Sequence, residues 1–117
     1  MRAGKAGLVG AGVVGALAIA ALSVSAAEPD PRDMQGHAIL AAKCAHCHNI
    51  ERVGPSPYPK APPFRTLSQR YPLERLAEPL AEGIVTGHPA MPQFVFSPSE
   101  IDAILSYMGA ISEKTAP

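Results

Sequence analysis

The chain has 117 residues, with ten basic and ten acidic side chains, 13 prolines, three Tyr, three Phe and no Trp. This balanced charge argues against a nucleic-acid-binding role and against a strongly basic face for an acidic partner. So few aromatic residues predict a thin apolar core, and a domain of this size normally needs stabilisation from disulfides, a metal or a cofactor.

The N-terminal segment has the organisation of an export signal. Arg2 and Lys5 precede residues 6–27, which carry no charged side chain and end in small residues before a polar stretch. This order is typical of a secretory signal peptide with a small-x-small cleavage site near Ala27. We therefore expect residues 1–27 to be a signal peptide and the mature protein to be periplasmic. The alternative is an uncleaved membrane anchor, because a helix of this length could just span a bilayer.

The first helix of the domain is predicted to deliver a cysteine motif. Asp33 is the expected N-cap of a helix that begins at Met34. Gly36, Leu40 and Cys44 then share one helix face at i, i+4 spacing.

The most specific motif is Cys44-Ala45-His46-Cys47-His48, which contains both cysteines of the chain. The pattern Cys-x-x-Cys-His predicts covalent haem attachment. Two thiols on one helical turn can each add to a vinyl group of the same porphyrin, and the next imidazole then reaches the iron. We expect Cys44 and Cys47 to attach one haem c covalently and His48 to be an axial iron ligand.

Other uses of a Cys-x-x-Cys pair fit this sequence less well. A thioredoxin-like pair requires a strand-helix-strand context, which the chain lacks. A zinc site needs a full tetrahedral ligand set. His37 or His46 could complete it, but the adjacent ligands Cys47 and His48 suit tetrahedral closure poorly. A disulfide or a free dithiol is the remaining alternative.

Residues 49–64 contain five prolines, which preclude regular helix or central strand. We expect a loop that wraps over the haem edge, with Ile50, Val53, Tyr58 and Phe64 as its apolar anchors. The alternative is a disordered proline-rich linker.

Residues 68–83 have a helical pattern, with Pro72 suited to the first turn and Gly83 to the C-terminal end. Pro79 is expected to kink or split this helix. Three glutamates at i, i+4 spacing form an acidic stripe, which indicates either a solvated face or a docking patch for a basic partner: Glu74, Glu78 and Glu82.

Met91 is the predicted sixth iron ligand. It lies in residues 87–92, a loop stiffened by Pro89 and Pro92, and a stiff loop loses little further entropy on ligation. A soft thioether suits ferrous iron, and His/Met ligation raises the reduction potential. The alternatives are His88 or an open sixth position. Four further candidates are expected to serve as core or surface residues or to lie on the proximal side: Met34, Met108, His37 and His46.

The last helix has the clearest local signal. Ser97 as N-cap and Glu100 three residues later form a capping box, and the helix is expected to end near Ile111. The resulting organisation is a linker at residues 28–32, a domain at residues 33–112 and a tail at residues 113–117.

These residues resemble the class I c-type cytochromes, of the small bacterial single-haem kind. The resemblance extends from Gly36 to about Ile111, and it depends on the Cys-x-x-Cys-His motif and on the pair Met91-Pro92. It implies an all-α cytochrome c fold, in which three to four short helices wrap around one covalently bound haem. It also implies that the first and last helices cross, with Gly36 and Leu40 facing Ile104 and Tyr107.

The resemblance further implies that a proline carbonyl accepts a hydrogen bond from the imidazole N–H of His48, and the candidates are Pro62 and Pro63. Arg65 or Tyr71 is a candidate for contact with a haem propionate, with a surface role as the alternative.

The function implied is that of a one-electron carrier rather than an enzyme. It would dock transiently with redox partner proteins such as a dehydrogenase, an oxidase or a reductase. No nucleic acid is expected, and membrane contact only if residues 1–27 stay attached. A permanently bound cytochrome subunit of a dehydrogenase is compatible with this interpretation. The alternative is a haem-based ligand sensor or peroxidase-like protein with an open sixth coordination site.

Overall fold

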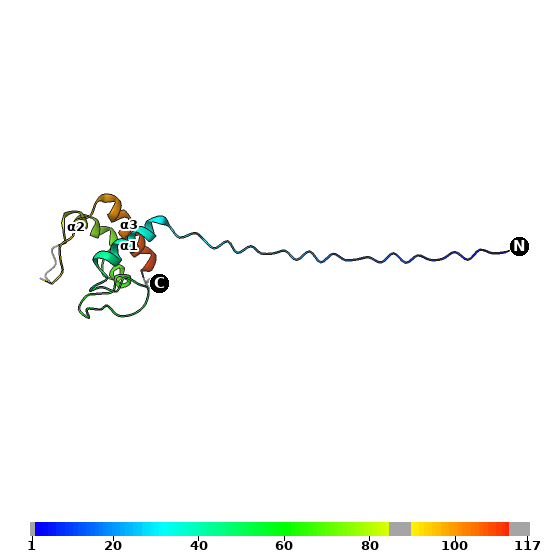
Figure 1. The fold of residues 1–117 in the computed structure, drawn as a ribbon, viewed down its shortest axis with the longest axis horizontal. Helices are drawn as coiled ribbons and strands as arrows, with labels where there is room; N and C mark the ends of the chain where they lie inside the picture. Colours follow the sequence, from blue (N-terminus) through cyan, green and yellow to red (C-terminus); the bar gives the residue numbers. More distant parts are fainter. Residues whose placement is uncertain (1, 85–89, 113–117) are drawn as a thin grey trace.

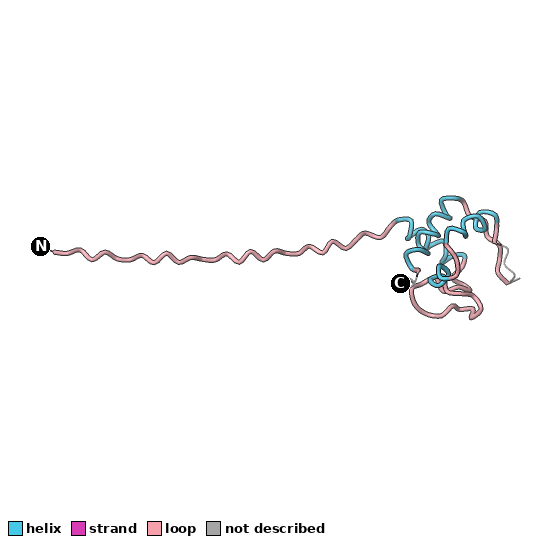
Figure 2. The backbone as a smooth tube through the Cα atoms, turned by 180° about the vertical axis from the view of Figure 1, so that it is seen from behind, coloured by secondary structure: helices cyan, strands magenta, loops and turns pink. Residues whose placement is uncertain are grey.

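The computed structural model describes residues 2–84 and 90–112. Within these ranges the chain forms helices and loops and no strand (Figure 2). The all-α architecture expected from the sequence is therefore confirmed. The elements, in chain order, are α1 (Pro31–Lys43), the 3₁₀ helices η1 (Phe64–Gln69) and η2 (Leu73–Leu76), α2 (Ala77–Glu82) and α3 (Pro98–Ile111). The predicted tail at residues 113–117 lies outside the described residues.

The N-terminal segment does not pack on the helices. Residues 2–29 are extended and exposed, and they lead away from the helical domain (Figure 1). None of the helices in the described part of the chain has the length and apolar character needed to cross a membrane.

Helix α1 begins three residues earlier than predicted. Its N-cap is Asp30, whose carboxylate accepts a hydrogen bond from the backbone N–H of Arg32 at 2.9 Å, and Pro31 occupies the first turn. Proline is favoured there because its missing N–H would have no intrahelical partner. The prediction of Asp33 as N-cap is therefore wrong, and Asp33 instead accepts a hydrogen bond from the hydroxyl of Ser106 on α3.

The fold is organised by the crossing of α1 and α3 (Figure 1). At the crossing, Gly36 faces Ala103 and Tyr107. A Cβ atom on Gly36 would overlap the carbonyl oxygen of Ala103 and lie 2.9 Å from the Cβ of Tyr107. Only glycine permits this approach, which confirms the expectation that Gly36 packs against the last helix.

Both helices of this pair contribute to the core. It joins the buried faces of α1 and α3 to side chains of the loops and of the short helices, and includes Leu40, Ile50, Phe64, Leu67, Leu80, Phe96, Ile101, Ile104, Met108 and Ile111. Met108 is 2% exposed, so its predicted core role is confirmed. Met34 is 62% exposed, because it lies on the solvent side of α1, and a core role for Met34 was the wrong prediction.

The predicted helix at residues 68–83 is in fact interrupted before Pro72. The proline ring disfavours helical geometry at the preceding residue, and Pro72 itself is extended, with φ −61° and ψ 130°. A second division falls between η2 and α2, at Leu76 and Ala77. Pro79 is the third residue of α2, where an N–H has no intrahelical partner, so the split expected near Pro79 is present. Gly83 ends α2 with φ +99°, as its predicted C-cap role requires.

Helix α3 has the predicted capping box. The hydroxyl of Ser97 accepts a hydrogen bond from the Glu100 N–H at 3.3 Å, and the Ser97 N–H donates to the Glu100 carboxylate at 2.8 Å. Hydrogen bonds from the Ser97 backbone N–H, and to a lesser extent from the Ser97 side chain, to the carboxylate lower the pKa of Glu100. The helix ends at Ile111, where the sequence placed its end.

Replacement of Gly36 by alanine tests the helix crossing. We expect Gly36→Ala to lower the free energy of unfolding by about 1–3 kcal/mol, since the added methyl forces α1 and α3 apart. Gly109→Ala is the matched control, because Gly109 is exposed on α3 and an added Cβ meets no atom within 4 Å. The control should raise stability by about 0.5–1 kcal/mol. Denaturant unfolding of the cofactor-loaded proteins measures both values. Equal free energies of unfolding for the wild type and Gly36→Ala would contradict the close contact.

Candidate functional site

The cysteine motif forms the turn that directly follows α1. The Cys44 N–H donates to the Leu40 carbonyl at 2.8 Å and so completes the helix, and the His48 N–H donates to the Cys44 carbonyl at 2.9 Å. Cys44, Cys47 and His48 are thus held within one compact turn. This arrangement is the one expected if two thiols and an imidazole bind the same cofactor.

The two cysteines are free thiols in different surroundings. Cys44 packs against the core, and burial raises the pKa of its thiol to about 11. Among the described residues, which include both cysteines and His37, His46 and His48, no group of three or more potential ligands could hold a metal ion. The structure therefore gives no support to the zinc alternative.

The orientation of His48 is fixed by a backbone carbonyl. Its Nδ1 lies 2.8 Å from the carbonyl oxygen of Pro62. A carbonyl only accepts, so Nδ1 carries the proton and Nε2 of the neutral ring keeps its lone pair for a metal. The carbonyl of Pro62 or of Pro63 was expected to accept this hydrogen bond, and the acceptor is Pro62. The ring of Phe64 packs beside the imidazole, with centroids 4.7 Å apart.

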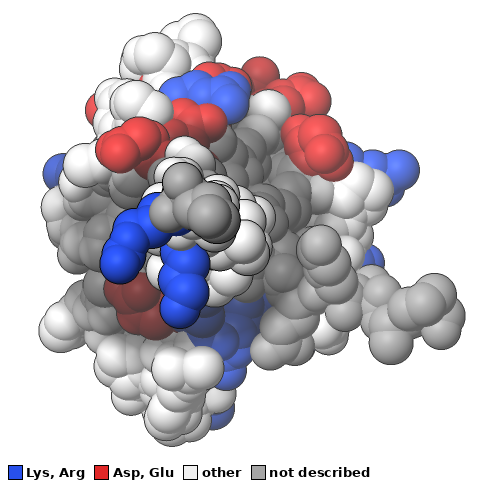
Figure 3. Space-filling model, turned by 90° about the vertical axis from the view of Figure 1, so that its right-hand side faces the viewer, with Lys and Arg blue, Asp and Glu red and all other residues white. Residues whose placement is uncertain are grey.

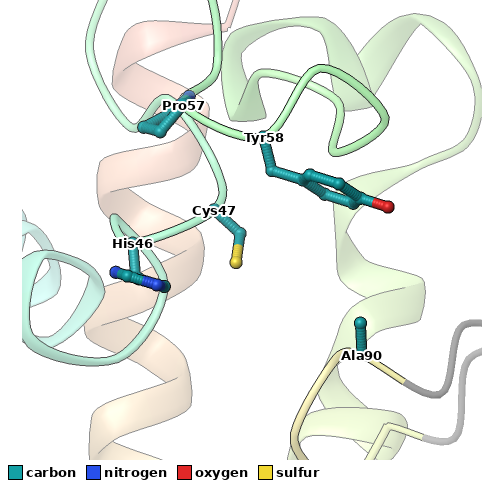
Figure 4. Close-up of a pocket in the computed structure, with 5 residues that line it drawn as sticks. All are labelled: His46, Cys47, Pro57, Tyr58 and Ala90. Carbon is teal, nitrogen blue, oxygen red and sulfur yellow. The ribbon is translucent and has the colours of Figure 1, made fainter.

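A cavity of about 430 Å³ opens beside the motif. It is lined by His46, Cys47, Pro57, Tyr58 and Ala90, and Figure 4 shows the Cys47 sulfur pointing into the space between the motif and Ala90. The loop side of the cavity is tied to the motif by a hydrogen bond from the Tyr58 N–H to the Cys47 carbonyl at 3.1 Å. The cavity thus separates the attachment motif from the segment that carries the predicted second ligand.

Met91 lies next to this cavity. It follows Ala90, which forms the wall facing Cys47, and it is partly buried, although it is not among the lining residues. The segment after Met91 is held by a hydrogen bond from the Phe96 N–H to the Leu80 carbonyl at 2.9 Å. The alternative ligand His88 lies outside the described residues.

The proline-rich loop is ordered around a residue that the sequence analysis missed. Asn49 hydrogen-bonds through its side chain to other parts of the loop, and its carbonyl accepts from the Phe64 N–H at 3.0 Å. The available signal was an asparagine beside the motif, since Asn forms side-chain-to-backbone turns. Of the four predicted anchors, Ile50 and Phe64 are buried, whereas Val53 and Tyr58 are 78% and 44% exposed, so that part of the prediction is wrong.

Both long helices hold the start of this loop. His37 of α1 lies 2.8 Å from the Glu51 carboxylate, and the Tyr107 hydroxyl of α3 donates to the Ile50 carbonyl at 2.8 Å. His37 therefore fastens the loop to α1. Arg65, a candidate for propionate contact, donates to the side-chain oxygen of Asn49 at 3.3 Å. The other candidate, Tyr71, packs against the core.

Charges of both signs share the surface. Figure 3 shows acidic side chains toward the upper part of one face, with basic side chains among and below them. The predicted acidic stripe is exposed, and it comprises Glu74, Glu78 and Glu82 of η2 and α2. Their exposure agrees with a solvated face and equally with a docking patch.

Comparison with protein families gives one match. A family model described as cytochrome c oxidase, cbb3-type, subunit III, matches residues 31–108. Neither the curated proteins nor the solved structures compared with the chain gave a significant match. The matched region begins at the first residue of α1 and includes the cysteine motif, Pro62 and Met91.

Replacement of the cysteines tests covalent attachment. We expect Cys44→Ala and Cys47→Ala each to leave a single thioether, which shifts the α band of the pyridine haemochrome to longer wavelength. The double variant should release all haem on acid extraction. His46→Ala is the control within the motif and should keep the wild-type spectrum. Wild-type spectra for both single variants would show that the thiols do not hold haem.

Proposed function

Because the chain belongs to the family of monohaem cytochrome c domains described as subunit III of cbb3-type cytochrome c oxidase, we propose that it is an exported one-electron carrier with His48 and Met91 as axial ligands. A domain of this family implies haem-based electron transfer, and it is typically a carrier rather than an enzyme. The observation that carries the proposal is the His48 imidazole, fixed beside two thiols with Nε2 left to bind a metal.

The donor set fits a covalently bound haem. Cys44 and Cys47 offer two thiols from one turn, His48 offers a neutral nitrogen, and a cavity opens beside Cys47. When bound, haem supplies a reversible change between ferric and ferrous iron. Cys44 and Cys47 would hold the group by thioethers, and the Pro62 carbonyl orients the His48 imidazole that would bind its iron.

Met91 is the proposed second ligand because of its position and chemistry. Ala90 beside it forms the cavity wall that faces the motif, and Phe96 is anchored to α2, so the segment between them is short and restrained. A thioether has no proton to gain or lose in this range, so Met91 itself would add no titrating group to the ligand set. Two fixed ligands also keep structural change small when one electron is gained or lost.

Location and partners follow from the same proposal. The charge and polarity pattern of residues 1–32 supports export to the periplasm, the compartment in which the thiols would receive haem. The partners would be redox proteins such as a dehydrogenase, an oxidase or a reductase, engaged by transient docking. A lasting association as a dehydrogenase subunit would appear as co-purification.

Replacement of Met91 tests the proposed ligation. We expect Met91→Ala to lose the near-infrared sulfur-to-ferric-iron band and to bind carbon monoxide in the ferrous state. Its reduction potential should fall by on the order of 0.1 V, since axial ligands shift haem potentials over a range of about 0.8 V. Met34→Ala is the control, because Met34 is exposed on α1.

The outcomes separate the candidate functions. Optical spectra of both redox states and a potentiometric titration measure the effects of both variants. Carbon monoxide binding by the wild-type protein, or a near-infrared band that survives Met91→Ala, would contradict Met91 ligation. The first result would favour a sensor or peroxidase-like role with an open sixth position.

A further inference from the structure

The side chain of Asn49 is fully engaged within the proline-rich loop. Its Oδ1 accepts from the Glu51 N–H at 2.8 Å and from Arg65 Nη1 at 3.3 Å. Its Nδ2 donates to the carbonyls of Val53 and Pro55, each at 3.2 Å. One amide therefore joins the first turn of the loop to η1.

The backbone of Asn49 joins the same parts of the loop. Its N–H donates to the Ser56 hydroxyl at 3.0 Å, and its carbonyl accepts from the Phe64 N–H at 3.0 Å. Phe64 is two residues beyond Pro62, whose carbonyl holds His48. Asn49 thus links the residue after the imidazole to the segment that provides its hydrogen-bond acceptor.

Gly54 shows that the loop is built closely around this amide. Its φ of +96° strongly favours glycine, and a Cβ atom placed on it would lie 3.2 Å from the Nδ2 of Asn49. A side chain at position 54 would therefore strain the backbone and press on the amide.

We propose that Asn49 is a positioning residue that sets the strength of the hydrogen bond from His48 Nδ1 to the Pro62 carbonyl, and thereby the reduction potential. The inference rests on the proposed function, in which His48 is an iron ligand. A stronger hydrogen bond makes an imidazole ligand more electron-donating and favours the ferric state.

The Asn49 side chain acts on Pro62 through Arg65 of η1, the helix that begins two residues after Pro62, and through the turn at residues 51–55. Loss of the amide removes these ties and leaves the backbone hydrogen bond to Phe64 as the remaining link. The hydrogen bond from His48 to Pro62 then weakens, and the potential rises.

A purely structural role is distinguishable, because another side chain fastens the loop elsewhere. The Tyr107 hydroxyl donates to the Ile50 carbonyl at 2.8 Å and ties the loop to α3. Its other hydrogen bond among the described residues is to the Glu51 carboxylate at 3.5 Å, which also lies at the start of the loop and away from Pro62 in the sequence. Tyr107→Phe therefore removes a loop tie and leaves the Asn49 hydrogen bonds in place, which makes it the matched control.

The experiment compares haem-loaded wild type, Asn49→Ala and Tyr107→Phe. At a fixed applied potential we expect Asn49→Ala to raise the ratio of reduced to oxidised protein at least about threefold, or about 28 mV at 59 mV per tenfold change. In the ferrous protein, the His48 Nδ1 proton resonance should move upfield and exchange faster with solvent. Tyr107→Phe should lower the unfolding midpoint without either change. Gly54→Ala, a second and independent disturbance of the amide, should shift the potential in the same direction as Asn49→Ala.

Failure of the positioning role of Asn49 can be distinguished from failure of the proposed function. Wild-type protein without a His48-ligated haem spectrum would refute the function itself, before any variant is compared. Given a normal wild-type spectrum, unchanged potential and unchanged proton resonance in Asn49→Ala would overturn the positioning role. Equal potential shifts in Asn49→Ala and Tyr107→Phe would do the same, since loop loosening alone would then explain them.

Discussion

The approach of α1 to α3 at Gly36 is the contact on which the remaining structure depends. With no side chain at this position, the backbone of α1 lies against the Ala103 carbonyl, and both elements of the site follow from that. Helix α1 ends in the turn that holds the two thiols and His48. Helix α3 presents the Tyr107 hydroxyl that fastens the loop returning to His48. One close contact between helices therefore sets the distance between the motif and its loop.

The site shares a wall with the core. Cys44 packs against the buried cluster, and Phe64 belongs to that cluster while its ring lies beside His48. Side chains that stabilise the fold are therefore the same ones that limit the movement of the ligand turn. In a chain with so few aromatic residues, Phe64 thus serves both the core and the site.

Prediction from sequence succeeded where the chemistry is local. The cysteine motif, the capping box of Ser97 and the C-cap of Gly83 involve neighbours within a few residues, and the sequence alone specifies them. The start of α1 was misplaced because two aspartates, Asp30 and Asp33, both suit an N-cap, and only the contact of Asp33 with Ser106 decides between them.

Among contacts between distant residues, the sequence predicted only those that the family resemblance implied, such as Gly36 against the last helix and His48 against Pro62. The pairing of His37 with Glu51 and the reach of Asn49 to Arg65 depend on how a loop folds back. The exposure of Met34 and Val53 likewise reflects which helix face or loop side meets the core, and periodicity does not specify that for short elements. The tendency of asparagine to form side-chain-to-backbone turns was a local signal for Asn49. Its hydrogen bond to Phe64, beyond Pro62, depends on the folded loop.

The place of Cys44 bears on how folding and cofactor attachment would be connected. Cys44 is partly buried and packs against the core at the end of α1, and Cys47 is partly buried beside the cavity. In the proposed function both sulfurs form thioethers, so the cofactor would be tethered to the same turn that ends α1. Folding of this turn and attachment of the cofactor would then be coupled steps.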